Sequence, residues 1–523
     1  MDEPTLFREI ASRIAQDTTT DVQVIKRLAA HEFHLSAVPR NSAILAAASP
    51  EDLPIVRSRL LVKPTRTLSG VAPVAVMTSP APCPHGRCLP CPGGPDHVFA
   101  SPQSYTGEEP AARRAREYDY DPYGQVRGRL SHYQVLGHYV DKADLIVMGG
   151  TITARPFEYQ SWFVGRCLAA MNDHGQATIT EGADPVVEAT RNETAAVRCI
   201  GLTFETRPDC ATRDVIDRML DLGVTKVELG VQHLSNRVLE LIRRGHTVEE
   251  VVRANTELRD AGLKVGFHMM PNLPGSPLEC DRAVYRALFG DSRFRPDFLK
   301  LYPTLVTPGA ELEDWYRRGE YEPYDEETLI ALIAEIKEGL PEYVRLQRVQ
   351  RDIPAKLIVA GSRHGNFRQL AAEHLRASGR TCRCIRCREI GRRASPQAPP
   401  SLSTLTYDCC GGQERFIQVT SAGSLIGFAR LRFPGATWRP ELEGAALLRE
   451  LHVYGAQVRL GSGAGAEEWQ HRNFGRELLA EAEKQAGEAG FGVVAIMSGI
   501  GVRPYYRRQG YIRDGPYMVK RIW

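Results

Sequence analysis

The sequence contains no apolar run near the ~20 residues that a membrane-spanning helix needs. Its first residues, MDEPTLFREIASRI, are acidic and amphipathic, whereas a secretory signal begins with a basic and then an apolar region. We find no internal repeat, and the only compositionally biased tract is the Pro/Ser-rich segment 393–403, which is typical of a linker. These absences exclude a helical membrane protein and a secreted one, so we expect a cytoplasmic protein.

The sequence also has little net charge, because 66 Lys and Arg stand against 63 Asp and Glu. The charge is unevenly distributed, since residues 342–393 hold 13 Lys and Arg against 4 Asp and Glu. Arg57, Arg59, Lys63 and Arg66 form a second basic stretch. A localised basic field indicates either a polyanionic partner or a solvated surface that binds nothing.

At 523 residues the chain is too long for a single core, which stops growing at roughly 250–300 residues. A helical, mixed-charge region covers residues 1–70, and strand-like runs then alternate with amphipathic helical stretches such as 211–223 and 247–262. The expected strands are 71–78, 143–150, 198–205, 225–232, 263–270 and 296–302. This alternation predicts an α/β protein with a parallel sheet, in a barrel or a doubly wound form, whose ligands gather at the strand C-terminal ends.

A second α/β unit of about 120 residues follows the linker. It has strand-like runs at 416–420, 425–433 and 446–454, then a helix over 473–490 and a strand over 491–497. We expect it to form a separate domain.

Cys83, Cys88 and Cys91 form a C-x4-C-x2-C run in a Pro/Gly-rich loop after the first strand. Three thiolates can hold three irons of a 4Fe-4S cluster and leave the fourth iron open to a substrate. A zinc site with His85 as the fourth ligand, or structural cysteines, are the alternatives. The position of the loop after the first strand of a βα pattern favours the cluster.

Polar and glycine residues end the next strands. Gly149 and Gly150, followed by Thr151, can expose backbone groups to a ligand, although such a pair is often only a turn. Glu205 with Arg207 and Gln232 close two further strands, where each could instead cap the following helix. Together these residues point to one site.

The cysteine loop and the motifs VMGGT, FETRPD and LYPTLV resemble those of S-adenosylmethionine (SAM) radical enzymes. With SGVAPVAVMTSPAPCPHGRCLPCPGGPD, SYTGEEPAARRAR and YDPYGQVRGRL, the chain resembles the catalytic subunit of the Elongator complex in its stand-alone bacterial or archaeal form, from about residue 60 to the C-terminus. The resemblance implies a partial (β/α) barrel of radical SAM type over 71–345. It implies a 4Fe-4S cluster on Cys83, Cys88 and Cys91, and SAM contacts from Gly149, Gly150, Thr151, Glu205, Arg207 and Gln232.

The sequence QHRNFGR precedes the helix of the second unit, where helix N–H groups can bind a pyrophosphate. It resembles the acetyl-CoA loop of GNAT-type acetyltransferases, which implies such a domain over 401–523. The family has glycine where this chain has Asn473. Asparagine tolerates positive φ best after glycine, so the loop can still form. Its side chain would, however, crowd the phosphates. The implied acetyl-CoA contacts are Lys142, Leu451, His452, Val453, Tyr454, Gln470, Phe474, Gly475, Arg476 and Tyr506. The implied catalytic residues are Tyr505, Tyr506 and Lys142.

Cys382, Cys384 and Cys387 form a C-x-C-x2-C group in a basic junction over 346–400. The spacing suits a structural zinc, for which His374 and Cys280 are candidate fourth ligands; a disulfide or free thiols are the alternatives. Five arginines are interleaved with this group, and their positive charge indicates a contact with a tRNA backbone. They are Arg383, Arg386, Arg388, Arg392 and Arg393.

The resemblance implies an acyltransferase that acts on the tRNA anticodon stem-loop. A SAM-derived radical would activate the acetyl group of acetyl-CoA, whose addition to the wobble uridine gives 5-carboxymethyluridine. The helical region 1–70 is a further candidate tRNA contact. There are two rival hypotheses. One is a protein lysine acetyltransferase with a structural cluster, and the basic surroundings count against it. The other is a non-catalytic RNA-binding scaffold, and the intact cysteine run counts against that. The sequence leaves open a homodimer, and whether the chain stands alone or as the core of an Elongator-like assembly.

Overall fold

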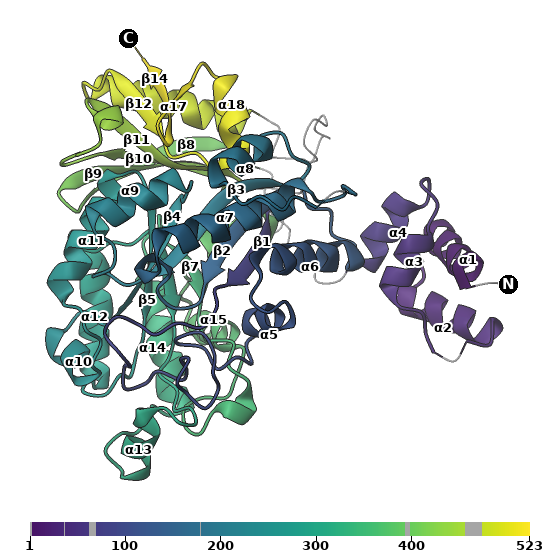
Figure 1. Ribbon diagram of the computed structural model, residues 1–523, viewed down its shortest axis with the longest axis horizontal. Coiled ribbons are helices and arrows are strands. Elements are labelled where there is room, and N and C mark those ends of the chain that lie inside the picture. Colours follow the sequence, from purple (N-terminus) through teal and green to yellow (C-terminus); the bar gives the residue numbers. More distant parts are fainter. Residues whose placement is uncertain are drawn as a thin grey trace.

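The computed structural model describes residues 3–35, 37–61, 70–177, 179–392, 398–454 and 473–522. It has a small helical module at the N-terminus, a barrel-like sheet of parallel strands, and a second sheet that carries the C-terminus (Figure 1). Within these residues, no helix combines the length and apolar character that crossing a membrane requires.

The N-terminal module has its own hydrophobic core. On α1 (Glu3–Gln16) the side chains of Leu6, Ile10 and Ile14 follow one another at four-residue spacing, so they share one helix face and pack against the neighbouring helices. The module stands away from the barrel beside the end of α6, where Gly137 lies against Leu45 and Leu61 (Figure 1). The other helices are α2 (Val22–Glu32), α3 (Asn41–Ala47) and α4 (Leu53–Leu60).

Seven parallel strands lie side by side in chain order and form a partial barrel. Each expected strand of this region is present, and a seventh that the sequence did not suggest, β7, closes the series. The strands are β1 (Ala72–Met77), β2 (Lys142–Met148), β3 (Arg198–Thr206), β4 (Lys226–Gln232), β5 (Lys264–Met269), β6 (Phe298–Leu301) and β7 (Arg345–Arg348).

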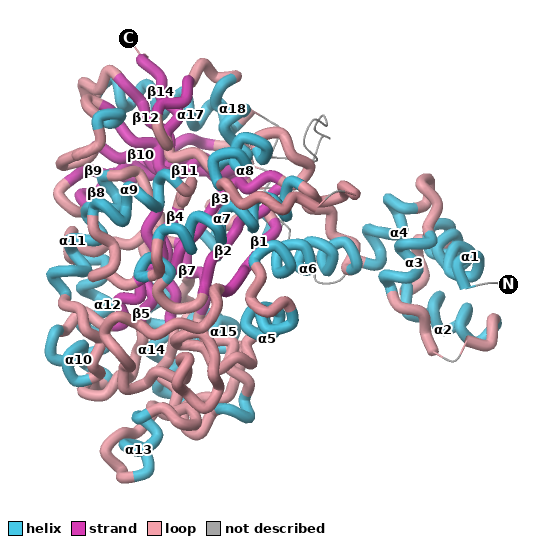
Figure 2. The backbone as a smooth tube through the Cα atoms, in the orientation of Figure 1, coloured by secondary structure: helices cyan, strands magenta, loops and turns pink. Residues whose placement is uncertain are grey.

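Helices connect the strands and cover the outside of the barrel (Figure 2). The predicted helix over 247–262 is α11, which begins with a capping box of Thr247 and Glu250 and buries Val251, Ala254 and Leu258. Loops gather at the strand C-terminal ends, away from the second sheet (Figure 2). The helices are α5 (Pro110–Glu117), α6 (Pro122–Val135), α7 (Phe157–Asn172), α8 (Pro185–Asn192), α9 (Arg213–Asp221), α10 (Asn236–Leu241), α11 (Val248–Asp260), α12 (Leu278–Gly290), α13 (Glu311–Arg317) and α14 (Glu326–Glu338).

The second sheet is mixed, with the strand order β13-β14-β12-β11-β10-β9-β8. Its parallel pair, β11 with β12, joins only the first four residues of β11, Ala445 to Leu448. Beyond that point β11 continues beside β10 alone, so the sheet splits between β11 and β12. Its elements are β8 (Ser401–Cys409), β9 (Gly412–Ser421), β10 (Ser424–Phe433), β11 (Ala445–Val453), α17 (Phe474–Glu488), β12 (Val493–Ile496), α18 (Arg503–Arg507), β13 (Ile512–Asp514) and β14 (Tyr517–Arg521).

A fully buried charge network joins the two sheets. Asp297, which precedes β6, accepts hydrogen bonds from both terminal nitrogens of Arg449 on β11, each at 2.8 Å. Arg449 also donates to Glu414 (2.8 Å), and Glu414 accepts from Arg259 of α11 (3.0 Å). Burial opposes ionisation of Asp297, but Arg259, Arg449 and Arg430 hold its pKa well below the usual range. The second sheet is therefore fixed to the barrel base by ion pairs that span both units.

The junction between the barrel and the second sheet contains α15 (Phe367–Ala377) and α16 (Ile385–Arg388). The tract expected to be a linker ends earlier than residue 403, because β8 already begins at Ser401 and pairs with β9.

Candidate active site

The thiols of Cys83, Cys88 and Cys91 face polar groups at the loop end of the barrel. Cys83 Sγ lies 3.7 Å from Thr151 Oγ1, and Gln103 Nε2 donates to Cys91 Sγ at 3.1 Å. Donors around sulfur favour thiolates. The three sulfurs do not all lie within 4.8 Å of one another, as the ligand atoms of two other groups in the described part of the chain do. They differ in this from Cys382, Cys384 and Cys387, whose sulfurs do gather within that distance.

His85 is placed to support a thiolate and not to ligate a metal. An arginine can only donate, so His85 Nδ1 must accept the bond from Arg207, which leaves its proton on Nε2. That nitrogen lies 3.0 Å from Cys88 Sγ and donates to it. Burial and then the charges of Arg207 and Arg244 lower the pKa of His85 to about 4, so the ring is neutral. The alternative of a zinc with His85 as its fourth ligand therefore finds no support.

Gly149 and Gly150 occupy conformations that L side chains rarely adopt, with φ of 121° and 103°. A Cβ on Gly149 would lie 2.2 Å from Thr78 Oγ1. The close contact of β1 with the end of β2 therefore requires glycine. Thr151 follows and reaches Cys83, so this strand end lies against the cysteine loop.

A cavity of about 550 Å³, which we call the loop-end cavity, opens beside the cysteine loop. This volume lies in the usual range for small-molecule sites. Its lining brings together Cys83, Gly150, Thr151, Glu205 and Arg207. Gln232 is not in this lining; it ends β4 with φ of 70°. Five of the predicted residues thus line one cavity, whereas Gly149, Cys88, Cys91 and Gln232 are not in its lining.

Arg207 has no N–H group left for a ligand. Its five donors go to Asp209, to His85, and to the carbonyl oxygens of Arg244 and Gly245. The side chain is 2% exposed. It therefore organises the cavity wall, and its direct contact with SAM stays a prediction.

Sequence reasoning missed a charged cluster inside the barrel. Lys300 Nζ contacts Glu228 and lies 3.3 Å from Glu205 Oε1, while His268 Nε2 lies 3.0 Å from Glu228 Oε2. Tyr105 donates to Glu205 Oε2 at 2.9 Å. The ligand atoms of Glu205, Glu228 and His268 lie within 4.8 Å of one another, but the Lys300 ammonium takes the place of a cation there. The available signal was a charged residue between apolar neighbours, as with Glu228 in VEL and Lys300 in LKL.

A second cavity of about 390 Å³, the base cavity, lies between the N-terminal ends of the barrel strands and the second sheet. Leu451, His452, Tyr454 and Tyr506 line it together. Burial, and then Tyr505, raise the pKa of Tyr506, so its phenol keeps its proton at neutral pH. The four residues predicted from separate motifs are thus gathered beside the split between β11 and β12.

The remaining predicted acetyl-CoA contacts that the structure describes are not in the lining of the base cavity. Asn473 adopts the left-handed conformation (φ 64°) directly before α17, as expected if it takes the place of a glycine. A Cβ on Gly475 would lie 3.2 Å from the Tyr505 hydroxyl and 3.9 Å from Val453. Phe474 is buried, Arg476 is exposed, and Gln470 lies outside the described residues.

Lys142 begins β2 at the base of the barrel. It pairs with Arg198 of β3. Arg198 in turn packs against Gly501 of the second unit, so closely that a Cβ on Gly501 would collide with it. Lys142 is not in the lining of the base cavity, so its contact with acetyl-CoA stays a prediction.

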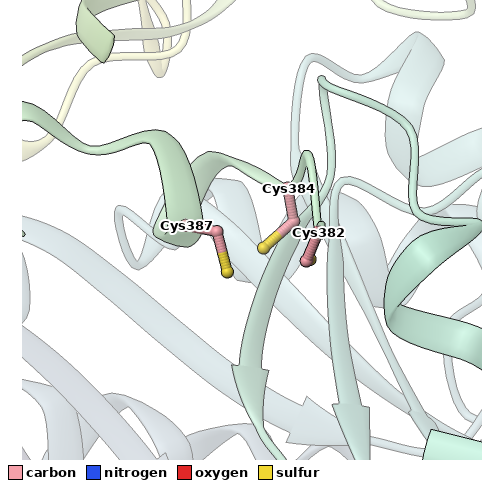
Figure 3. Close-up of side chains that lie close together, drawn as sticks. All are labelled: Cys382, Cys384 and Cys387. Carbon is pink, nitrogen blue, oxygen red and sulfur yellow. The ribbon is translucent and has the colours of Figure 1, made fainter. Parts of the chain in front are cut away.

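Cys382, Cys384 and Cys387 bring their sulfurs within 4.8 Å of one another (Figure 3). This separation fits one tetrahedral ion, and zinc stays the prediction. Neither His374 nor Cys280 belongs to this group, so the fourth ligand stays a prediction.

The arginines of the junction differ in their surroundings. Arg388 is buried, and it donates to Gln418 Oε1 (2.9 Å) and to the Glu342 carbonyl (2.8 Å), so it cannot bind a tRNA phosphate as we had expected. Arg386 lines the base cavity, and Arg383 is exposed. The side chains of Arg392 and Arg393 lie outside the described part of the chain.

Comparisons with known proteins agree with this arrangement. Family models for the ELP3 N-terminal domain, the Radical SAM superfamily and the Radical_SAM C-terminal domain match residues 5–68, 138–288 and 296–377. The cysteine loop, the parallel strands and these matches define a radical SAM enzyme.

The chain is 43% identical to the tRNA uridine(34) acetyltransferase of Methanocaldococcus jannaschii over 542 residues, covering 100% of this chain and 99% of that protein. It is 40% identical to Elongator complex protein 3 of Homo sapiens, covering 99% and 96%. The solved structure of archaeal Methanocaldococcus infernus Elp3 with an N-terminal deletion superposes with a TM-score of 0.76 at 40% identity, covering 87% of this chain and all of that one. The chain belongs to the family of Elongator complex protein 3 and the tRNA uridine(34) acetyltransferases.

Proposed function

We propose that this enzyme modifies the wobble uridine of tRNA, using SAM and acetyl-CoA to form 5-carboxymethyluridine. The observation that carries the proposal is that the loop-end and base cavities occupy opposite ends of one barrel that buried ion pairs fix to the second sheet. An enzyme that must join a radical to an acetyl group needs both sites in one rigid body. The activity named for the relatives supports the same substrate.

Cys83, Cys88 and Cys91 would hold a 4Fe-4S cluster, which when bound supplies the electron for radical formation from SAM. The strand-end backbone of Gly149 and Gly150 would approach SAM closely, because no side chain stands in the way. SAM would also contact Thr151 and Glu205, while Arg207 fixes His85 against the cysteine loop.

The second unit would act as a GNAT-type domain for acetyl-CoA. The split between β11 and β12 would admit the pantetheine arm, and the N-terminal end of α17 would bind the pyrophosphate. Tyr506, kept protonated by burial, is placed to donate to the thioester or to a leaving thiolate. Cys382, Cys384 and Cys387 would hold a structural zinc.

The rim of the loop-end cavity suits an RNA anticodon. Arg348 and Arg351 lie in its lining with Tyr105 and Tyr302. Arginines bind phosphates, and aromatic rings stack on bases that leave a single-stranded loop. A flipped uracil would thereby reach the cavity that contains the SAM residues.

The test is nucleoside mass spectrometry of unmodified tRNA after anaerobic incubation with cluster-loaded enzyme, SAM, acetyl-CoA and a reductant. We expect 5-carboxymethyluridine only when all components are present. The product should be lost in Cys88→Ala and kept in Cys210→Ala, a cysteine outside the cluster loop. Acetylated lysine peptides without a modified nucleoside would overturn the proposal in favour of a lysine acetyltransferase.

A further inference from the structure

The base cavity and the loop-end cavity lie at opposite ends of the barrel interior and share the lining residues Pro73 and Gln347. On β4, Lys226 lines the base cavity and Glu228 lines the loop-end cavity. On β5 the same holds for Lys264 and His268. Residues two apart on a strand face the same side and lie roughly 6.6 Å apart. Lys226 and Glu228 bracket the boundary between the cavities at this separation. Lys264 and His268 are four positions apart, roughly 13 Å, and Gly266 lies between them.

Gln347 of β7 lies at this boundary and lines both cavities. With its amide oriented to suit both neighbours, Nε2 donates to Glu228 Oε1 at 3.1 Å and Oε1 accepts from Lys226 Nζ at 3.1 Å. Lys226 and Glu228 are also 3.0 Å apart. We call these three residues the waist. Because Lys226 and Glu228 form a buried ion pair, each group released from it needs a new hydrogen-bond partner.

Gly266 of β5 packs closely against the waist. It lies between the two positions that line the cavities, and a Cβ there would be 3.3 Å from Glu228 Cγ and 3.3 Å from Phe298 Cβ. Any larger residue would therefore press on the waist.

We propose that the acetyl end of acetyl-CoA enters the loop-end cavity through the barrel interior, and that Gln347 is the gate at the waist. The inference rests on the proposed function, because it connects the acetyl-CoA site to the radical site. The thioester stays intact during passage, so no bond is made or broken. The Gln347 amide and the Lys226 ammonium can donate to the thioester carbonyl as they release Glu228, which compensates the broken hydrogen bonds.

The route can be tested with bromoacetyl-CoA and a cysteine placed beyond the waist. In His268→Cys, the introduced thiolate would displace bromide from the probe, forming a carbon–sulfur bond and releasing its proton to the buffer. Cluster-loaded, anaerobic protein is used because Cys83 lines the same cavity. The modified residue is identified by peptide mass spectrometry, a readout that needs neither SAM nor tRNA.

We expect labelling of His268→Cys, its loss when Gln347→Trp is added, and several-fold faster labelling with Gln347→Met, which keeps the length but not the hydrogen bonds. The matched control is Leu451→Cys in the base cavity, which should be labelled with and without Gln347→Trp. If the tryptophan variant does not bind acetyl-CoA, Gly266→Ala narrows the waist from β5 and should slow labelling instead.

Unchanged labelling of His268→Cys in a folded Gln347→Trp protein would overturn this route. So would the absence of that labelling in protein that binds acetyl-CoA saturably. Wild-type protein without saturable acetyl-CoA binding would overturn both the route and the acetyl-CoA site, so the binding measurement separates the two failures.

Discussion

Asp297 is the residue on which the attachment of the second sheet to the barrel depends most. It is fully buried, and three arginines surround its carboxylate, Arg449 at 2.8 Å, Arg259 at 3.3 Å and Arg430 at 3.5 Å. Asp297→Asn keeps the shape but removes the charge and turns an N–H group toward arginine donors. Removing one partner of a buried ion network costs about 3–5 kcal/mol, so we expect the free energy of unfolding to fall by that amount.

The matched control is Asp291→Asn. It is the same substitution in the same connection between α12 and β6. Asp291 pairs with Arg293 at 2.7 Å, but that arginine is 62% exposed, and exposed pairs contribute at most about 1 kcal/mol. Urea unfolding of both variants, loaded with cluster to the same extent, gives the comparison. If Asp297→Asn costs no more than Asp291→Asn, the reasoning about the network is wrong.

The same prediction has a pH dependence with a defined sign. The folded pKa of Asp297 lies below its unfolded value of roughly 3.9, so its contribution is fully present above that value and is lost as the pH falls toward the folded pKa. The difference in stability between wild type and Asp297→Asn should therefore be constant from pH 5 to 8 and shrink below about pH 4. Acetyl-CoA affinity should also fall, because Arg430 holds Glu450 of the base cavity at 2.7 Å.

Four further predictions concern the sites. Cys384→Ser should lose zinc and keep iron, and Cys88→Ser the reverse, by elemental analysis of the purified proteins. Tyr506→Phe should slow thioester cleavage by about 10²-fold or more with acetyl-CoA affinity unchanged, because it removes a positioned proton donor; equal rates would contradict that role. Asn473→Gly should bind acetyl-CoA a few-fold tighter by calorimetry, since it removes the side chain from a left-handed position. Gly149→Ala should lose SAM binding and about 1–3 kcal/mol of stability, because of its contact with Thr78 Oγ1.

The barrel was predictable from the sequence because its strands are apolar runs between amphipathic helices. β7 was not, since its four residues RLQR include two arginines and contain no hydrophobic pattern. β8 is mostly exposed, and its first residues, 401–403, belong to the Pro/Ser-rich tract that is typical of a linker. Both strands are specified by neighbours far away in the chain, which local patterns do not reveal.

The candidate site divides in the same way. Motifs with fixed spacing, such as the cysteine loop and the glycine pair, identify their residues directly. The Lys300 cluster and the waist at Gln347 combine residues of different strands, and only the curvature of the partial barrel brings these strands together. The same limitation explains why Arg388 looked available to tRNA, although its guanidinium is buried between the two sheets.

The most direct test of the central claim follows the hydrogens of the acetyl group. The enzyme is incubated with SAM, a reductant, tRNA and acetyl-CoA deuterated at the methyl group. If a SAM-derived radical activates that methyl group, deuterium should appear in 5′-deoxyadenosine, and the carboxymethyl group of the modified uridine should come from the labelled acetyl group. Modified uridine formed without any deuterium in 5′-deoxyadenosine would contradict the claim.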